Sequence, residues 1–485
     1  MRIAWFGVWW RLVKLTLAEA ALGCGAKLEA PTSVSNVGAL EVCGYSINSR
    51  TISAGELFFA VRGERHDGHD YIQSALELGA VGAVVSVSRV AHLSNATLSA
   101  PLLIVEDTLV ALQALAAHVR RRWGRRVVAI TGSAGKTSTK DAVAAALGAQ
   151  FSVMKSAGNL NNGFGMPLQL LRLEAEHEYA VIELGMNHAG EIAQLARIAA
   201  PDWGVVTNVG MAHVENFSDG QAGIARAKYE LVAALPASGV VFLNGADAYV
   251  SQFGRDFAGK VVYFGAGPCA DPAILAAEEL ADGLGVTVQE GEETFSLKLK
   301  LLGRHHAVNA AAALAVAREA GVATERAIAA LEALVAGDRR GEVILVGGAT
   351  IVNDSYNSNP EALKSMIATL AARPVTEPGA RRILIAGEML ELGEYAPALH
   401  AECGRVAAEA GIDLVVGVRG NAVHLVRAAA EAGAMSVFLA DAGAAGEWLR
   451  RHLQAGDQVL LKGSRGVKLE AALTAIDKLG GEHPQ

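Results

Sequence analysis

The stretch ITGSAGKTSTK, residues 130–140, combines lysine and small hydroxyl residues with two glycines. It follows an apolar run that predicts a strand, and it leads into a segment of helical composition. In such a loop, backbone N–H groups bind phosphate oxygens and the following helix directs its positive end toward them. Lys136 would reach the β and γ phosphates of a nucleotide, and the Thr137 hydroxyl would bind Mg²⁺. The loop residues expected to contact the nucleotide are Gly132, Ser133, Ala134, Gly135, Lys136, Thr137 and Ser138.

This loop is a short form of the phosphate-binding loop. The usual loop has a glycine five places before its second glycine, and here Ile130 occupies that place. A second apolar run, residues 179–184, contains Glu183 near its end. A carboxylate at the carboxyl end of a strand can face bound phosphates and hold Mg²⁺, although an acidic residue there can also be a solvated sheet edge. ATP and Mg²⁺ are therefore the expected cofactors.

The elements that must position these residues follow an α/β pattern. Apolar strand-like runs alternate with alanine- and leucine-rich stretches, which predicts α/β domains with largely parallel sheets. The length suggests roughly three domains, and we expect them at residues 1–120, 121–338 and 339–485, the last Rossmann-like. The expected strands lie within residues 55–63, 81–87, 101–107, 127–131, 179–184, 204–209, 239–244, 260–265, 381–387, 412–418, 435–440 and 457–463, and a helix is expected within 303–321.

Composition marks both expected boundaries. Near the first, arginines gather between Arg120 and Arg126. This cluster indicates either a connection between domains or a solvated helix end. Near the second boundary, residues 335–342 turn to glycine and charge, which is typical of a connecting segment.

The overall composition excludes several classes of protein. Hydrophobic residues make up 52% and charged residues 19% of the chain, which indicates a globular protein and not a disordered one. The net charge of −8 gives no support for a nucleic-acid partner. Cysteines are far apart and form no CxxC pair, which favours free thiols in a reducing compartment. These cysteines are Cys24, Cys43, Cys269 and Cys403.

The first 14 residues are apolar and aromatic with basic residues interspersed. This segment is too short to span a bilayer and lacks a small-residue cleavage site. We expect a helix packed on the first domain, with a weak membrane-surface anchor as the alternative. No later run reaches spanning length, so we expect a cytoplasmic protein without stable membrane insertion.

Three further motifs, together with the short loop, carry a resemblance to a known family. They are GNLNNGFGMPLQLL at residues 158–171, NDSYNSNPEAL at 353–363 and EMLELG at 388–393. With them the chain resembles the Mur ligase family from about Leu15 to the final KGSRGVKLE. The resemblance implies a small α/β N-terminal domain, a P-loop ATPase central domain and a Rossmann-like C-terminal domain. These would bind the UDP-sugar peptide, ATP and the incoming dipeptide, respectively.

Within the family, the motifs are similar to the branch that joins D-alanyl-D-alanine to UDP-N-acetylmuramoyl-tripeptide and so forms the pentapeptide precursor of peptidoglycan. A carboxylate is a poor acyl electrophile, so such an enzyme would transfer the γ-phosphoryl group of ATP to it. The dipeptide amine would then attack the acyl phosphate, and phosphate would leave. Both steps concentrate negative charge, which requires metal ions and cations more than a covalent nucleophile.

The resemblance also assigns roles around the phosphates. It makes His213 a metal ligand beside Thr137 and Glu183. Lys228 matches a lysine that relatives carry as a carbamate, which would supply ligand oxygens to the metal, although Tyr229 here replaces the usual glycine. Arg340 matches an arginine that approaches the γ-phosphate. The residues expected to act in catalysis are thus Lys136, Lys228, His213 and Arg340.

Other positions are matched at the edges of the site. Asn309 would contact the adenine, although the usual His-Asn pair before it is His305 and His306 here. The third domain would close over the nucleotide with Asp354, Asn357 and Asn359. The residues expected to bind substrate are Ser49 and Arg50 for the uridine nucleotide, with Asn48 where an aspartate is common, Asn161 and Asn162 of the GNLNN motif, and Lys462, Ser464 and Arg465 for substrate carboxylates.

Several alternatives remain at this level. A sister Mur ligase adds a single diamino acid to UDP-N-acetylmuramoyl-dipeptide, but it has a histidine where YNSNP has Asn357. A folate polyglutamylating ligase would lack the UDP-sugar domain. A guanine-nucleotide switch would need an NKxD string, which does not occur. A noncatalytic scaffold would not need Lys136, Glu183 and His213 together.

Overall fold

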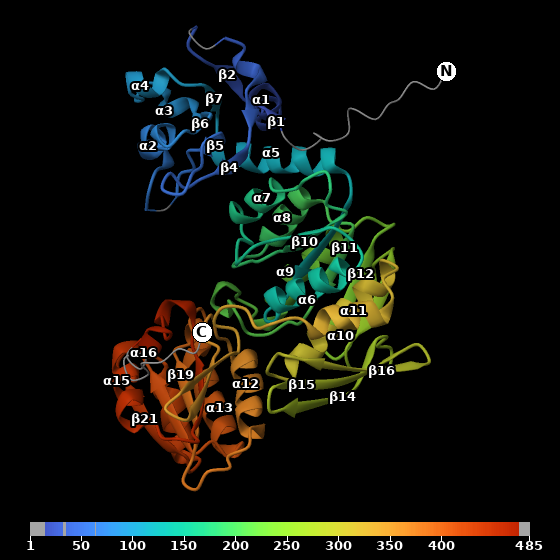
Figure 1. Cartoon of the computed structure of the whole chain (residues 1–485), viewed down its shortest axis with the longest axis vertical. Coiled ribbons are helices and arrows are strands. Elements are labelled where there is room, and N and C mark those ends of the chain that lie inside the picture. Colours follow the sequence, from blue (N-terminus) through green and yellow to red (C-terminus); the bar gives the residue numbers. More distant parts are fainter. Residues whose placement is uncertain (1–14, 33–34, 64, 475–485) are drawn as a thin grey trace.

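The computed structural model describes residues 15–32, 35–63 and 65–474. It has three α/β domains, with the first at one end of the molecule and the central one between it and the third (Figure 1). The predicted α/β class is confirmed. The helix expected in residues 1–14 lies outside the described residues. None of the described helices has the length and apolar character needed to cross a bilayer.

The first domain is built on a five-stranded sheet of order β2-β7-β6-β5-β4, in which the β2–β7 pair is antiparallel and the other neighbours are parallel. All three strands predicted here are confirmed. Its strands are β1 (Leu15–Thr16), β2 (Lys27–Glu29), β3 (Glu41–Val42), β4 (Gly44–Ser46), β5 (Glu56–Phe59), β6 (Gly82–Ser86) and β7 (Leu102–Val105). Its helices are α1 (Leu17–Cys24), α2 (Ile72–Glu77), α3 (Val87–Val90), α4 (Asn95–Leu98) and α5 (Thr108–Trp123).

The helix α5 runs through position 120, so the predicted boundary there falls inside a continuous helix and stays a prediction. Arg120, near its end, is buried and is not a solvated helix end. Its guanidinium donates to the carbonyl oxygens of Ala199 and Ala200 and lies 2.9 Å from Asp202 Oδ2. Arg120 therefore links α5 to residues 199–202, which lead into the central sheet.

The central domain has a six-stranded parallel sheet of order β13-β12-β11-β8-β10-β9. The apolar runs of its four inner strands are buried on both faces, as is typical of parallel strands. The strands are β8 (Arg126–Thr131), β9 (Val153–Lys155), β10 (Tyr179–Glu183), β11 (Trp203–Val206), β12 (Val240–Asn244) and β13 (Lys260–Phe264). The helices are α6 (Lys136–Gly148), α7 (Gly165–Leu170), α8 (Glu191–Ala199), α9 (Gln221–Ala234), α10 (His305–Glu319) and α11 (Thr324–Glu332).

A separate antiparallel sheet follows the central one and was not among the predicted strands. It consists of β14 (Ala273–Leu280), β15 (Gly283–Glu290) and β16 (Glu293–Leu299). Its buried side chains, such as Val286 and Leu297, pack in the same hydrophobic cluster as α10 and α11. The sheet therefore extends the core of the central domain.

The third domain has a six-stranded sheet of order β17-β18-β22-β19-β20-β21, parallel except for the β17–β18 hairpin. The four strands predicted here are confirmed, and the hairpin adds two. The strands are β17 (Glu342–Val346), β18 (Ala349–Asn353), β19 (Arg382–Gly387), β20 (Leu414–Val418), β21 (Met435–Leu439) and β22 (Gln458–Lys462). The helices are α12 (Pro360–Ala372), α13 (Ala396–Glu409), α14 (Ala422–Glu431), α15 (Ala442–His452) and α16 (Ala471–Thr474).

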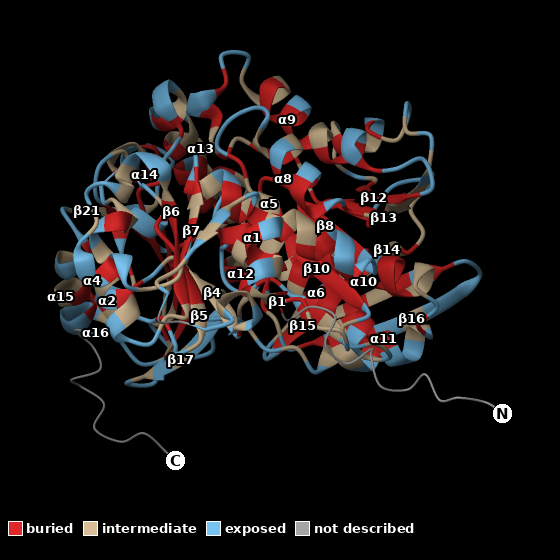
Figure 2. Cartoon of the chain, turned by 90° about the horizontal axis from the view of Figure 1, so that it is seen from above, coloured by how far each residue is buried: buried red, intermediate tan, exposed pale blue. Residues whose placement is uncertain are grey.

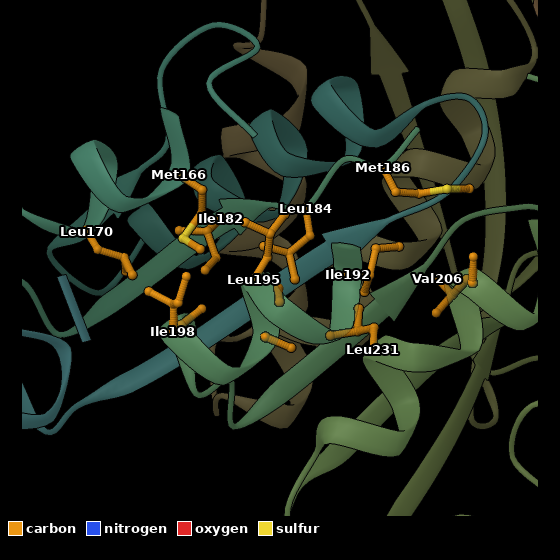
Figure 3. Packing of buried hydrophobic residues seen from close by; sticks show 14 of the residues in the cluster. Met166, Leu170, Ile182, Leu184, Met186, Ile192, Leu195, Ile198, Val206 and Leu231 are labelled. Atoms are coloured by element: carbon orange, nitrogen blue, oxygen red, sulfur yellow. The ribbon is translucent and has the colours of Figure 1, made fainter. Parts of the chain in front are cut away.

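The burial pattern separates the strands from the loops around them, with buried residues along the interior of each sheet (Figure 2). On one face of the central sheet, Ile182 and Leu184 pack against Met166 and Leu195 (Figure 3). Because side chains alternate along a strand, Glu183 points to the opposite face, where α6 packs. This alternation brings the carboxylate of β10 next to the helix that follows the ITGSAGKT loop.

Candidate active site

A cavity of about 440 Å³ lies between the central and third domains. Many of the predicted site residues line it, from both domains. These are Ser133, Ala134, Gly135, Lys136, Thr137, Ser138, Asn161, Glu183, His213, Asn309, Arg340, Asp354, Asn357, Lys462 and Arg465, and Asn359 also lines it. The predicted residues that do not line it are Ser49, Arg50, Gly132, Asn162, Lys228 and Ser464.

The phosphate loop, residues 132–138, connects β8 to α6 and is shaped by two side chains from the end of β11. Asn208 Oδ1 accepts from Ala134 N at 2.8 Å, and the Thr207 hydroxyl donates to Ala134 O at 2.7 Å. A Cβ at Gly132 would overlap the Thr207 hydroxyl, so this close approach requires glycine. The sequence interpretation missed both partners because it placed Thr207 and Asn208 inside the strand run 204–209. β11 ends at Val206, which leaves both residues at its carboxyl end, where such sites form.

Lys136 bends back over this loop. Its Nζ donates to Gly132 O at 2.8 Å. Desolvation lowers the pKa of Lys136, the nearby Arg340 lowers it further and Glu183 opposes the change. The ammonium is thus held by weak carbonyl partners inside the cavity, where a phosphate would be a stronger partner.

Glu183 is buried at the end of β10 and has two partners from different segments. The Thr137 hydroxyl donates to its Oε2 at 2.8 Å, and Asn161 Nδ2 donates to its Oε1 at 2.7 Å. A hydroxyl and a carboxylate side by side are oxygen donors of the kind that Mg²⁺ prefers. Thr137 and Glu183 therefore fit a magnesium ion, and Asn161 holds the Glu183 carboxylate by a hydrogen bond to its Oε1.

His213 lines the same cavity but has a partner from the third domain. Its Nδ1 lies 2.5 Å from Glu391 Oε2. The proximity of His213 lowers the pKa of Glu391. In the described part of the chain, no group of three or more His, Cys, Asp or Glu side chains is arranged to hold a metal. The contact with Glu391, a residue of the EMLELG motif, was not predicted from the sequence, and the role of His213 as a metal ligand stays a prediction.

Lys228 is buried on α9, outside the cavity lining. Burial lowers its pKa well below the usual value, and the charge of Lys136 lowers it further. Within residues 15–32, 35–63 and 65–474, its ammonium has no hydrogen bond or ion pair. Tyr229, the departure from the family pattern, packs its ring on Phe253 at 5.4 Å between centroids. The tyrosine thus has its own place in the core.

The helix α10 closes the cavity above the loop. Asn309 Oδ1 accepts from the Thr139 hydroxyl at 3.0 Å, which ties α10 to α6. Burial lowers the pKa of His305 to about 4, and the charge of Lys462 acts in the same direction. Burial also lowers the pKa of His306 well below its usual value. Both imidazoles are therefore neutral at pH 7.

On the third-domain side, Lys462 is the central group. Its Nζ donates to Asp354 Oδ2 at 2.6 Å and to Asn357 O at 3.0 Å. The Ser464 hydroxyl donates to Ser358 O at 3.3 Å. Lys462 and Ser464 therefore hold the loop of residues 354–359 in place, and their role toward a substrate carboxylate stays a prediction.

The remaining predicted residues lie away from the cavity. In the first domain, Ser49 is buried and Arg50 is exposed in the loop after β4, where Arg50 N donates to Asn48 Oδ1 at 3.0 Å. Asn162 accepts from Gly165 N at 2.9 Å and so fixes the start of α7. The uridine-nucleotide role of Ser49 and Arg50 stays a prediction, as does substrate binding by Asn162.

Comparison with family models gives matches in all three domains. Residues 41–120 match the Mur ligase family, catalytic domain, residues 130–317 match the Mur ligase middle domain, and residues 339–465 match the Mur ligase, glutamate ligase domain.

Curated relatives match over most of the chain. The UDP-N-acetylmuramoyl-tripeptide--D-alanyl-D-alanine ligase of Escherichia coli is 36% identical over 440 residues, 89% of this chain and 93% of that protein. The protein of the same name from Bacillus subtilis is 34% identical over 435 residues, 88% of this chain and 91% of that protein.

Solved structures agree in fold. MurF from Acinetobacter baumannii is similar with a TM-score of 0.84 at 27% identity, covering 96% of this chain and 99% of that one. MurF ligase from Thermotoga maritima in complex with ADP is similar with a TM-score of 0.78 at 28% identity, covering 90% of this chain and 97% of that one.

Proposed function

Because this chain belongs to the Mur ligase family, we propose that it joins D-alanyl-D-alanine to UDP-N-acetylmuramoyl-tripeptide with conversion of ATP to ADP and phosphate. The observation that carries the proposal is the identity of 36% over 440 residues with a ligase of that name. The cavity supports it, because the phosphate loop and the YNSNP segment line one space. The product is the pentapeptide precursor of peptidoglycan.

The reaction proceeds in two balanced steps. A carboxylate oxygen of the tripeptide attacks the γ-phosphorus of ATP, the bond from that phosphorus to the β–γ bridging oxygen breaks, and ADP leaves. The dipeptide amine then attacks the carbonyl carbon of the acyl phosphate and loses a proton, and phosphate leaves with the former carboxylate oxygen. Both steps gather negative charge at one point, so fixed cations provide most of the catalysis.

The residues of the cavity divide this work. Lys136 and Arg340 would bind the transferred phosphoryl group from opposite domains. Thr137 and Glu183 would hold Mg²⁺, which when bound supplies positive charge beside the phosphates. Asn161 keeps the Glu183 carboxylate oriented through its 2.7 Å hydrogen bond.

Lys228 would act as a carbamate. A neutral amine attacks CO₂ and releases a proton, and the low pKa that burial gives Lys228 favours the neutral amine. The carbamate anion would lie near Lys136, and the positive charge of Lys136 would then attract it instead of opposing a charge on Lys228. His213 would join the metal site from the same cavity.

The three domains would bind different ligands. Residues 1–120 would bind the uridine nucleotide with Ser49 and Arg50, residues 121–338 would bind ATP with Asn309 near the adenine, and residues 339–485 would bind the dipeptide. Asp354, Asn357 and Arg465 come to the cavity from the third domain, so we infer that this domain excludes water from the acyl phosphate. We infer a cytoplasmic location, which the free cysteines support.

A substrate assay tests the proposal. Phosphate release by the purified chain with ATP and Mg²⁺ should require UDP-N-acetylmuramoyl-tripeptide and D-alanyl-D-alanine together. Each substrate alone should give only background release. Turnover with UDP-N-acetylmuramoyl-dipeptide and a free diamino acid, with no use of the D-alanyl dipeptide, would establish the sister activity instead.

A further inference from the structure

Two adjacent arginines in front of β17 have different partners. Arg339 Nη1 lies 2.5 Å from Glu470 Oε1, and its Nε donates to Asp338. The Arg340 guanidinium has no hydrogen bond or ion pair to any residue that the structure describes. Its contact is the ring of Tyr356, whose centroid lies 3.8 Å from Arg340 Cζ.

The β17–β18 hairpin explains why this pair meets. Glu342 and Asn353 are opposite each other in the hairpin, so the residues just before β17 lie beside those just after β18. Tyr356 N donates to Arg339 O at 3.1 Å, which continues this pairing beyond the strands. The ring of Tyr356 is thus placed by main-chain contacts under the neighbouring arginine.

A second guanidinium approaches the same ring from the segment after β22. Arg465 Cζ lies 5.5 Å from the Tyr356 centroid. Unlike Arg340, Arg465 has an acidic partner, since its Nη1 lies 3.4 Å from Glu470 Oε1. All three side chains line the cavity. The shorter contact and the absence of an acidic partner single out the Arg340–Tyr356 pair.

An aromatic ring and a carboxylate can both hold a guanidinium, but they differ in how many of its N–H donors remain free. A carboxylate would neutralise the guanidinium and occupy its N–H donors. The face of a ring attracts the cation while the donors at the edge of the guanidinium plane stay free for an anion. Arg340 is therefore held without losing its capacity to bind a phosphoryl group.

We propose that Tyr356 is a positioning residue whose ring holds the Arg340 guanidinium over the cavity, so that its donors meet the transferred phosphoryl group. This inference rests on the proposed ligase function. The tyrosine hydroxyl has no part in it, since the contact is with the ring face.

The test compares Tyr356→Phe with Tyr356→Leu in the full ligation assay. The Phe variant keeps the ring and should retain kcat within about twofold, whereas the Leu variant should lose about tenfold in kcat, the scale of one partly buried cation–π contact. The KM for D-alanyl-D-alanine should stay within about twofold in both. Equal losses in the two variants would overturn the proposal.

A double-mutant cycle then asks whether Tyr356 acts through Arg340. In the background of Arg340→Met, the further change Tyr356→Leu should cost less than about twofold, because the group it positions is already gone. A full additional tenfold loss would overturn the proposal.

A matched control is Arg126→Gln, which removes a cation–π contact with Trp203 at 4.5 Å outside the cavity and should leave kcat unchanged. The wild-type assay distinguishes failure of the proposed ligase function from failure of the proposed role of Tyr356. Absence of wild-type ligation would reject the proposed function, whereas ligation with an additive cycle would reject only the role of Tyr356.

Discussion

On the central-domain side of the cavity, the polar groups come from the ends of neighbouring parallel strands. The third-domain side combines two such groups, Lys462 at the end of β22 and Asp354 just after β18, with Arg340, Tyr356 and Arg465 from the connecting loops. The central groups are already joined to one another, as in the Thr137–Glu183 hydrogen bond of 2.8 Å. The third-domain cations are held by an aromatic ring or by a carboxylate of their own domain. From this difference we expect the central side to bind phosphate and metal in a fixed site, to which the third domain brings additional charge.

Removing the lysine of the central side should have the largest effect. We expect Lys136→Ala to lose on the order of 10²-fold or more in ligation rate, because a preorganised cation at the phosphates is lost. The thermal midpoint should stay close to that of the wild type, since Lys136 Nζ contacts only loop carbonyls. Steady-state kinetics and thermal melting of the purified variant check this, and near-normal turnover would show that the loop does not bind the reacting phosphate.

Lys228 tests whether the central side is completed by a modification. Lys228→Ala should lose about 10²-fold in rate, and added short carboxylic acids should restore part of it by supplying oxygens in the space left. Lys228→Glu is the matched variant, because its side chain places a carboxylate at the same position. Full activity of the Ala variant without added acid would contradict the carbamate.

Lys462 is the lysine on the third-domain side of the cavity, and unlike Lys136 it has a carboxylate partner among the described residues, Asp354. Lys462→Met leaves the Asp354 carboxylate without its 2.6 Å partner, so we expect a loss of about 3 kcal/mol in the free energy of unfolding. Asp354→Asn with Lys462→Met should recover part of that loss, since the unpaired charge is removed. Denaturant unfolding measures both, and an unchanged midpoint in the single variant would show that this pair does not stabilise the loop.

The smallest expected effect is the pH dependence that His305 contributes. Its folded-state pKa of about 4 lies below the unfolded value, so the unfolded chain binds more protons between about pH 6.5 and 4, and stability falls as the pH drops through this window. Between pH 7.5 and 5.5 we expect His305 to contribute about 1 kcal/mol of this fall. His305→Gln should reduce the difference in unfolding midpoint between these pH values, and an unaltered difference would exclude His305 as its source.

Much of the fold could be predicted because apolar runs in parallel sheets are visible locally. The predicted runs around Val128, Ile182 and Val416 are all buried strands. β14 could not be predicted in this way, since its Ala-Ala-Glu-Glu composition favours a helix and only pairing with β15 makes it a strand. The β17–β18 hairpin did carry a signal, because the consecutive glycines Gly347 and Gly348 separate two apolar runs, and both adopt the positive φ values of a tight turn.

The site divides in the same manner. Lys136 and Thr137 could be predicted because they lie in one short loop, and Glu183 because it lies near the end of one apolar run. The pairs Asn161–Glu183, His213–Glu391 and Arg340–Tyr356 join segments that are distant in the chain or separated by a hairpin. Such pairings depend on how the sheets and domains pack, so local pattern could not reveal them.

If the tripeptide carboxylate accepts the γ-phosphoryl group before the amine attacks, one of its oxygens must leave with the phosphate, and an isotope measurement detects this transfer. The terminal carboxylate of UDP-N-acetylmuramoyl-tripeptide is labelled with oxygen-18 at both oxygens, and ligation is run with ATP and D-alanyl-D-alanine. We expect one labelled oxygen in each released phosphate and the other in the new amide. Unlabelled phosphate accompanying full product formation would contradict the acyl phosphate and the site built to make it.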